Sequence, residues 1–188
     1  MVALPLLERG ETVRTDYIDR KTARAVFRSM QPANRLICEV CCNTGLRIDD
    51  VCALKTRDLK MAKKKSNWLV VIEQKTGKRK VLRLRNTDID RMLWQAGDVY
   101  VFQHRTDSAK HRARQTVWRD LARSARPLRR QGVVVSPHSL RKLYAVEKWD
   151  KFHDINKIKR LLNHDNVATT MLYVMSRELT QQKNTTRK

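Results

Sequence analysis

The sequence predicts an α+β domain that is mostly helical and carries one small antiparallel sheet, formed by a hairpin. Two observations predict this class. Apolar side chains recur at helical spacing over most of the chain, and two runs rich in β-formers, residues 68–73 and 79–84, flank a turn that contains glycine. Alternating β–α units, a glycine-rich phosphate loop and a Walker-type lysine motif do not occur, so nothing in the sequence supports nucleotide hydrolysis.

The first part of the chain is predicted to form two helices. Asp19 can cap a helix that runs to about Met30. Residues 33–43 are expected to form the next helix, because their apolar side chains are spaced as in a core helix. The dipeptide Thr44-Gly45 ends that helix.

The segment that leads into the hairpin is predicted to hold a short helix and a basic loop. Asp49 can cap the short helix, and residues 60–65 are expected to form the loop. Late in the second hairpin run, residues 79–84, apolar residues alternate with basic ones. One face of that strand is therefore expected to pack and the other to be charged.

After the hairpin the pattern is helical almost throughout. Pro137 is expected to introduce a helix that starts near His138, and Asp154 to cap the next one. The expected elements are, in order, a helix around residues 89–93, a short run at 99–102, a very basic helix over 108–124, a loop at 126–132, the helices that begin near 138 and 154, a turn at 163–166, and a last helix that carries Tyr173.

The chain is strongly basic. Its 188 residues include 41 Lys and Arg against 19 Asp and Glu, a formal net charge of +22. Such an excess repels itself in a compact protein unless a polyanion offsets it, so nucleic acid is the expected partner. The length fits one domain, predicted at residues 16–178 between an N-terminal arm or linker remnant (1–15) and a basic C-terminal tail (179–188).

Membrane and metal-binding proteins are two classes that the sequence does not support. No run reaches the roughly 18 to 20 apolar residues of a membrane span, and no basic leader precedes the apolar start, so a cytoplasmic protein without a membrane partner is expected. No metal and no cofactor are expected. The cysteines are interpreted as buried thiols, because they lie in apolar helical runs and no second ligand pair has zinc-finger spacing. They are Cys38, Cys41, Cys42 and Cys52.

Metal-free cleavage of a phosphodiester needs a nucleophile, fixed cations for the charge of the transition state, and a proton donor for the leaving oxygen. The sequence holds such side chains in five motifs: Thr44-Gly45-Leu46-Arg47 with Asp50 three residues further on, Gln74-Lys75-Thr76-Gly77-Lys78, His138-Ser139-Leu140-Arg141, Leu161-Leu162-Asn163-His164, and Tyr173 nine positions after His164. Each motif alone has an ordinary structural explanation. Their joint order and spacing resemble the catalytic domain of the tyrosine recombinase (phage integrase) family, over about residues 16–178.

The resemblance implies a role for each matching residue. Arg47 and Arg141 would clamp the scissile phosphate, and Lys75 would protonate the 5′-hydroxyl leaving group. Asp50 would orient the basic residues without reacting. Asn163 stands where the family usually has glycine, and asparagine tolerates the same positive-φ turn.

Two histidines and a tyrosine complete the implied site. Tyr173 would form a 3′-phosphotyrosyl intermediate, which conserves the bond energy, so that rejoining needs no ATP. His138 would hydrogen-bond the phosphate and help to deprotonate the tyrosine. His164 would make a further phosphate contact in the transition state.

The resemblance also implies partners and a source. The partners are double-stranded DNA at a recombination site, a homotetramer on paired sites, and accessory DNA-bending or directionality proteins; the source is a prokaryote, a phage or a mobile element. Residues 177–188 form the segment that relatives dock onto a neighbouring protomer. The basic residues expected to contact DNA are Lys78, Arg79, Lys110, Arg112, Arg114, Arg119 and Lys142.

Several alternatives stay open at this point. Family members usually carry an N-terminal core-binding domain, and only about 15 residues precede the first expected helix, so the chain is either an excised catalytic domain or a naturally short recombinase. The chemistry also fits a type IB topoisomerase-like activity, and the fold fits a DNA-binding regulator derived from a recombinase. A metal-dependent nuclease is disfavoured, because the sequence shows no carboxylate cluster to hold the metal.

Overall fold

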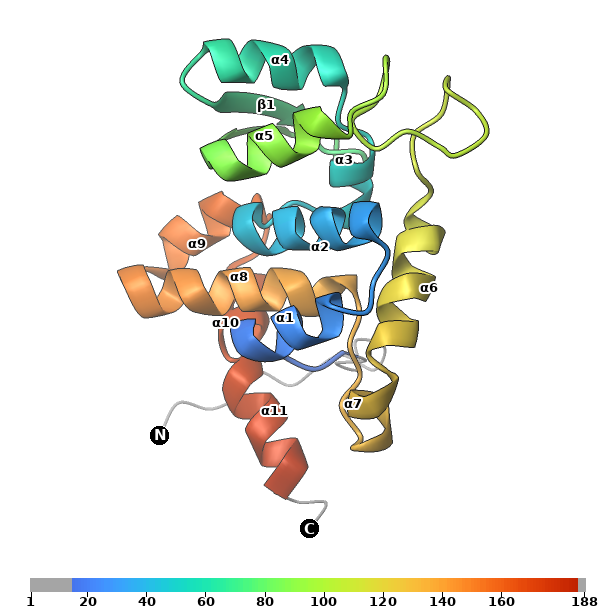
Figure 1. Ribbon diagram of the computed structural model, residues 1–188. Coiled ribbons are helices and arrows are strands. Elements are labelled where there is room, and N and C mark those ends of the chain that lie inside the picture. Colours follow the sequence, from blue (N-terminus) through green and yellow to red (C-terminus); the bar gives the residue numbers. More distant parts are fainter. Residues whose placement is uncertain (1–14, 186–188) are drawn as a thin grey trace.

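The computed structural model describes residues 15–185, which form a mostly helical domain with one two-stranded antiparallel sheet (Figure 1). The predicted α+β, mostly helical class is confirmed. The predicted N-terminal arm, apart from Thr15, and residues 186–188 of the predicted tail lie outside the described residues. No helix within residues 15–185 has both the length and the apolar character that crossing a membrane requires.

The elements follow one another without β–α alternation. The first part of the chain forms α1 (Arg20–Phe27), α2 (Pro32–Thr44), α3 (Ile48–Cys52), α4 (Thr56–Lys64), β1 (Trp68–Ile72), β2 (Arg79–Arg83) and α5 (Asn86–Trp94). The second part forms α6 (Arg114–Ser124), α7 (Arg126–Arg130), α8 (Pro137–Phe152), α9 (Ile155–Leu162), α10 (Val167–Val174) and α11 (Ser176–Thr185).

Helices α2 and α8 pack against each other at the centre of the domain (Figure 1). Ile37 and Val40 of α2, and Leu140 and Leu143 of α8, are almost fully buried. Each large apolar side chain that is removed from water stabilises the fold by roughly 1.5–3 kcal/mol. This packing fixes the end of α2 relative to the start of α8.

The four cysteines are buried free thiols, as predicted. Burial raises the pKa of each thiol, to about 12 for Cys42 and for Cys52. Neutral buried thiols pack as small apolar side chains.

The predicted helix starts are correct at Asp19 and Asp154, whose carboxylates accept hydrogen bonds from backbone N–H groups in the first turns of α1 and α9. The cap predicted at Asp49 is wrong. Arg47 is the N-cap of α3, and its backbone N–H donates to the carboxylate of Asp50. The acidic residue at the third helical position therefore closes this helix start, in the manner of a capping box.

Two segments that were expected to be loops are helical. Most of residues 60–65 lies in α4, because Leu59 and Ala62 bury one side of a helix whose lysines face solvent. Residues 126–132 contain the short helix α7, which has a proline in its first turn.

The basic helix predicted over residues 108–124 begins later than expected. Gln103 and His111 form an isolated antiparallel bridge, and residues 108–110 form a turn and a bend instead of a helix. Helix α6 therefore starts only at Arg114.

The predicted tail, residues 179–188, is helical as far as its described part extends. Thr180 Oγ1 accepts a hydrogen bond of 2.9 Å from the backbone N–H of Tyr17, and Lys183 forms an ion pair of 2.7 Å with Asp16. Helix α11 is thus attached to the start of the described chain, and the boundary predicted at residue 178 falls inside a helix.

The hairpin forms at the predicted place, and its register turns one lysine inward. Val71 lies opposite Lys80, and Val70 lies opposite Val81. Opposite residues share one side of a sheet, and Val71 is buried. Lys80 is therefore turned inward and 7% exposed, while Val81 is 45% exposed. The alternation expected late in this run is found, because Arg83 is exposed and Leu84 is buried. Lys80, earlier in the run, is turned inward because pairing with β1 sets the register.

Gly45 ends α2 in the left-handed conformation, with φ 65°. It also lies against the ring of Tyr144, where an added β-carbon would be 2.5 Å from the nearest ring atom. Gly77, in the hairpin turn, has the same φ of 65°, but an added β-carbon there would meet nothing within 4 Å. A substitution at Gly77 therefore introduces backbone strain alone, whereas a substitution at Gly45 adds a steric clash.

We expect Gly45→Ala to lower the free energy of unfolding by about 2–4 kcal/mol, because left-handed strain of about 1–2 kcal/mol adds to a clash with a buried ring. Gly77→Ala meets the strain alone and should cost about 1 kcal/mol. Urea unfolding of both variants and of the unchanged protein measures the difference. Equal losses would contradict the close packing of Gly45 on Tyr144.

Candidate active site

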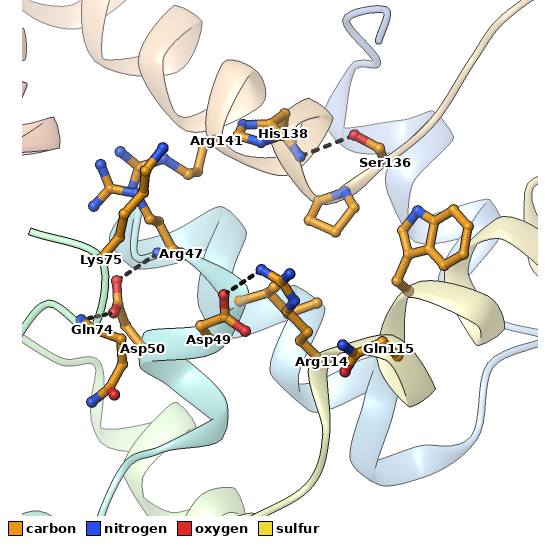
Figure 2. A pocket seen from close by; sticks show the side chains of 13 residues that line it. Arg47, Asp49, Asp50, Gln74, Lys75, Arg114, Gln115, Ser136, His138 and Arg141 are labelled. Carbon is orange, nitrogen blue, oxygen red and sulfur yellow. Dashed lines mark hydrogen bonds and ion pairs between the residues drawn. The ribbon is translucent and has the colours of Figure 1, made fainter. Parts of the chain in front are cut away.

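A pocket of about 760 Å³ lies between α3, the hairpin turn, α6 and the start of α8. Figure 2 shows Arg47, Lys75 and Arg141 together on one side of this pocket, with Arg114 and Gln115 on another. Within residues 15–185, no group of three or more His, Cys, Asp and Glu side chains is arranged to hold a metal ion. The pocket is thus lined by cations that belong to three of the five sequence motifs.

Arg47 is held by a buried carboxylate. Its Nη1 donates to Glu73 Oε2 over 2.6 Å, and the side chain of Glu73 is 0% exposed. Thr76 Oγ1 donates to the same carboxylate oxygen over 2.7 Å. Burial raises the pKa of Glu73, but the hydrogen bonds from Thr76 and Arg47 outweigh burial, and the pKa lies below its ordinary value. The ionised carboxylate therefore orients the guanidinium of Arg47.

Asp50 joins the arginine turn to the hairpin turn. Its Oδ2 accepts a hydrogen bond of 3.3 Å from the backbone N–H of Arg47, and its Oδ1 accepts one of 2.8 Å from the backbone N–H of Gln74. Because Gln74 precedes Lys75, this carboxylate, together with that of Glu73, sets the spacing between the segments that carry Arg47 and Lys75. Burial raises the pKa of Asp50.

Arg141 lies inside the domain, near the start of α8, and is 2% exposed. Its Nη1 donates to the carbonyl oxygen of Gly45, and its Nη2 donates to that of Leu162 over 3.2 Å. Burial lowers the pKa of Arg141, but the guanidinium stays charged because the ordinary pKa of arginine is very high. One cation thus joins α8 to the end of α2 and the end of α9.

His164 lies against Arg141, after a turn in which Asn163 takes the expected left-handed conformation with φ 58°. Arg141 Nη2 donates to His164 Nε2 over 3.2 Å, and His164 Nδ1 lies 3.1 Å from Thr170 Oγ1. Burial, followed by the charge of Arg141, lowers the pKa of His164 to about 4. The imidazole is therefore neutral at neutral pH, with Nε2 as acceptor and Nδ1 as donor.

Tyr173 connects the two histidines. Its hydroxyl oxygen lies 2.9 Å from Nδ1 of His138, and its ring packs edge-to-face against His164 with centroids 5.1 Å apart. Burial, followed by the charges of Arg141 and Lys142, lowers the pKa of His138. A neutral imidazole at this distance can accept the phenolic proton.

Lys75 lies in the hairpin turn and lines the pocket, where Figure 2 shows it beside Arg47 and Arg141. Lys78, in the same turn, forms an ion pair with Asp165. This ion pair connects the hairpin to the turn between α9 and α10. The structure therefore brings together the six residues that were predicted to be catalytic: Arg47, Lys75, His138, Arg141, His164 and Tyr173.

Comparison with known proteins identifies the family of this chain. The family model described as "Phage integrase family" matches residues 17–179. The chain belongs to the phage integrase family. A curated relative, Tyrosine recombinase XerA of Pyrococcus furiosus, is 32% identical over 146 residues, which cover 74% of this chain and 49% of XerA. This integrase-family chain thus spans about half the length of the curated relatives it matches.

Solved structures of similar proteins share the fold of this integrase-family domain. A crystal structure of XerA recombinase aligns with a TM-score of 0.69 and 20% identity over 97% of this chain and 66% of the XerA chain. A lambda integrase tetramer bound to a Holliday junction aligns with a TM-score of 0.68 and 18% identity over 92% of this chain and 51% of that one. The predicted tyrosine recombinase catalytic-domain fold is confirmed.

The integrase-family domain presents the residues predicted to contact DNA in different ways. Arg79 and Arg119 are exposed on β2 and α6, and Lys110 is exposed in the loop before α6. Arg114 lines the pocket and donates to a carboxylate of α3 over 3.0 Å. Arg112 is half-buried and donates over 3.1 Å to an asparagine of α2. These five positions, and Lys78 in the hairpin turn, stay predicted DNA contacts.

The predicted DNA contact at Lys142 is wrong. Lys142 is 6% exposed, and its Nζ donates to the carbonyl oxygen of Thr15 over 2.6 Å. Burial lowers its pKa to about 8. Successive helix residues are rotated by about 100°, so the residue after Arg141 points to a different side of α8.

Three residues of this network were not found from the sequence. Glu73 accepts a hydrogen bond from Arg47, and Thr170 is hydrogen-bonded to His164. Lys80 donates to a backbone carbonyl at the end of α2. A weak signal existed for Glu73, since an acidic residue at the end of an apolar strand and beside the lysine turn is unusual. Thr170 and Lys80 carry no signal in a single sequence.

We expect this integrase-family domain to lose stability through His164 as the pH falls from about 6.5 to 4. The unfolded imidazole takes up a proton near pH 6.5, whereas the folded one resists until about pH 4, so the unfolded state binds more protons in this window. The free energy of unfolding should fall by about 1–2 kcal/mol, which is less than the full pKa difference implies because His164 is partly exposed to solvent. Urea unfolding at about pH 7 and pH 4.5 should show a smaller pH-dependent loss for His164→Gln than for the unchanged protein.

The control for this experiment is His104→Gln, which removes an imidazole from the loop before α6. It should retain the full loss of stability. If His164→Gln also retained the full loss, the neutral buried state of His164 would be contradicted.

Proposed function

We propose that this chain is the catalytic domain of a site-specific DNA recombinase or integrase that cleaves and rejoins DNA through a 3′-phosphotyrosyl intermediate, without a metal ion or ATP. The observation that carries the proposal is the 2.9 Å hydrogen bond between the Tyr173 hydroxyl and His138, beside a pocket lined by Arg47, Lys75 and Arg141. In this arrangement a single phosphate meets a nucleophile, a base and three cations.

Tyr173 supplies the nucleophilic oxygen. His138 accepts the phenolic proton, and its lowered pKa keeps the imidazole neutral and able to act as a base. A bond forms between the tyrosine oxygen and phosphorus, while the bond from phosphorus to the 5′ oxygen breaks. Lys75 donates a proton to that oxygen, which leaves as a 5′-hydroxyl.

Arg47 and Arg141 stabilise the charge that builds up on the non-bridging oxygens. A guanidinium carries five N–H donors in a fixed plane. Within residues 15–185, the hydrogen bonds described for the Arg47 guanidinium use Nη1 alone, which leaves donors for a phosphate. Because both guanidinium groups are held by carboxylate or carbonyl partners before DNA binds, little reorganisation is needed in the transition state.

Rejoining is the reverse of cleavage. A 5′-hydroxyl attacks the phosphotyrosyl phosphorus, Lys75 takes its proton, and Tyr173 leaves with the proton that His138 returns. The diester linkage to the protein retains the energy of the broken phosphodiester. No nucleotide hydrolysis is therefore required.

The substrate is double-stranded DNA at a recombination site, and strand exchange between two duplexes calls for four protomers. The lambda integrase tetramer bound to a Holliday junction, which shares the fold, supports this assembly for the present chain. In the described residues α11 is attached to residues 16 and 17 of its own chain, so docking of the C-terminal segment on a neighbour would require these contacts to open. Accessory DNA-bending or directionality proteins, and action on DNA in a prokaryotic cytoplasm, belong to the same proposal.

We expect Tyr173→Phe to abolish covalent attachment to DNA, with a loss of at least about 1,000-fold in adduct formation, because no other group supplies the attacking oxygen. A suicide duplex, nicked close to the cleavage site, traps the adduct, which denaturing gels detect. The matched control is Tyr144→Phe, which removes the hydroxyl of a tyrosine buried on α8 and should leave the adduct unchanged.

The same assay separates the alternatives. If the unchanged protein forms no adduct on a cognate site, the proposal fails and a DNA-binding regulator is favoured. Relaxation of supercoiled DNA that is independent of sequence would indicate topoisomerase-like activity instead of recombination.

We expect adduct formation to continue at an unchanged rate in excess EDTA, because Arg47, Arg141 and Lys75 supply the positive charge that a metal ion would otherwise provide. Quantified adduct on the suicide duplex, with and without EDTA, measures this. A loss of more than about tenfold would indicate metal-ion catalysis and contradict the metal-free mechanism.

A further inference from the structure

Lys80 is a lysine on the inner side of the hairpin, where the sequence pattern does not place a charge. It is 7% exposed, and its cross-strand partner, Val71, is also buried. Lysine is almost never buried to this extent without a polar partner, because removing an ammonium from water is costly. The ammonium of Lys80 must therefore have a polar partner inside the domain.

The partner of Lys80 is the end of helix α2. Its Nζ donates to the carbonyl oxygen of Thr44, the last residue of the helix, over 3.3 Å. The next carbonyl oxygen, that of Gly45, accepts a hydrogen bond from Arg141. The backbone carbonyls of the two residues that end α2, shortly before Arg47 in the chain, are thus each bound by a cation, one from β2 and one from α8. A cation at this position also interacts favourably with the negative end of the helix dipole.

The other charges around Lys80 belong to the site. The cations Arg47 and Arg141 disfavour its charged form, whereas Glu73 and Asp50 favour it. Its charge in turn disfavours protonation of His164. Burial, followed by the charge of Arg141, lowers the pKa of Lys80 to about 7. The ammonium is therefore charged below neutral pH and loses its charge as the pH rises through this value.

We propose that Lys80 is a positioning residue for DNA cleavage: its buried ammonium attaches β2 to the end of α2 and so holds the hairpin turn with Lys75 at a fixed distance from Arg47. This inference rests on the proposed function. Asp50 joins these two turns through backbone N–H groups, and the ion pair between Arg47 and Glu73 joins them through side chains. Both contacts reach the β1 side of the hairpin turn. Lys80 adds a third connection, from the β2 side, to a backbone carbonyl of α2.

Connections on both sides of the turn constrain its orientation as well as its distance. With Asp50 and Glu73 alone, only the β1 side is held, so the β2 side can pivot about the backbone of Gln74 and Lys75 moves relative to the arginines. A displacement of about 1 Å in a reacting group can reduce a rate by about 100-fold. A DNA phosphate in the arginine pocket adds negative charge nearby, which favours the charged form of Lys80. Substrate binding thus strengthens the connection that aligns the leaving-group acid.

The test compares three variants with the unchanged protein. Lys80→Met keeps the length of the side chain and removes its charge, and Lys80→Arg keeps the charge. Lys142→Met is the matched control, because Lys142 is also a buried lysine that donates to a backbone carbonyl, but at Thr15. Single-turnover adduct formation at subsaturating suicide duplex is measured from about pH 5.5 to 8.5, beside DNA affinity and thermal unfolding.

We expect Lys80→Met to slow adduct formation by about 10- to 100-fold near pH 6, with DNA affinity changed by less than about threefold. Because a desolvated charge is removed, its thermal midpoint should be equal to or higher than that of the unchanged protein. The deficit should shrink above pH 7, where the wild-type amine loses its own charge. Lys80→Arg should restore the rate and keep it at high pH. Lys142→Met should change the rate by less than about threefold, because the charge of Lys142 contributes to the lowered pKa of His138 only after burial and Arg141.

Other results overturn the inference. A rate for Lys80→Met within about threefold of the unchanged protein, or an equal loss in Lys142→Met, would remove the specific role of Lys80. If Lys80→Met does not fold, the pH profile of Lys80→Arg decides, and a profile identical to that of the unchanged protein rejects the role. Failure of the unchanged protein to form any adduct would instead reject the proposed function, and this inference with it.

Discussion

The buried guanidinium of Arg141 holds together the segments on which the site depends. It donates to the carbonyl oxygens of Gly45 and Leu162 and to the ring of His164, and so connects α8 with the ends of α2 and α9. A buried cation is tolerated only where its donors are satisfied, so the three segments must approach it in one arrangement. The glycine at position 45 makes this possible, because its left-handed turn presents the carbonyl while its α-carbon packs on Tyr144.

The site concentrates positive charge before any substrate is present. Glu73 and Asp50 are the acidic residues beside Arg47, Arg141 and Lys80, and the cations disfavour one another. The low pKa of His164 and the lowered pKa of His138 have the same origin, namely burial beside fixed cations. Such a cluster reduces stability and is relieved by an anion, which is the electrostatic reason to expect a phosphate in the pocket. The same field keeps His138 neutral beside Tyr173, in the state that a base requires.

The fold class and the residues within the motifs could be predicted, because the spacing of apolar residues and the order of motifs can be read along the sequence. The role of a residue could not be predicted where it depends on the side of a helix or strand to which the side chain points. Lys142 follows Arg141 directly, yet the helix turns it toward Thr15, and Lys80 is turned inward by the register with β1. Glu73 acts through a hydrogen bond to Arg47, 26 positions away, which no local pattern encodes. Helix α4 was missed because its apolar face is narrow and its lysines suggested a loop.

The identity of the linked residue tests the central claim most directly. The covalent adduct, trapped on a suicide duplex and digested with protease and nuclease, is mapped by tandem mass spectrometry, and the released DNA end is analysed for its terminal group. The mechanism predicts a nucleotide joined through its 3′-phosphate to Tyr173 and a free 5′-hydroxyl on the other DNA fragment. Linkage to another residue, or through a 5′-phosphate, would contradict it.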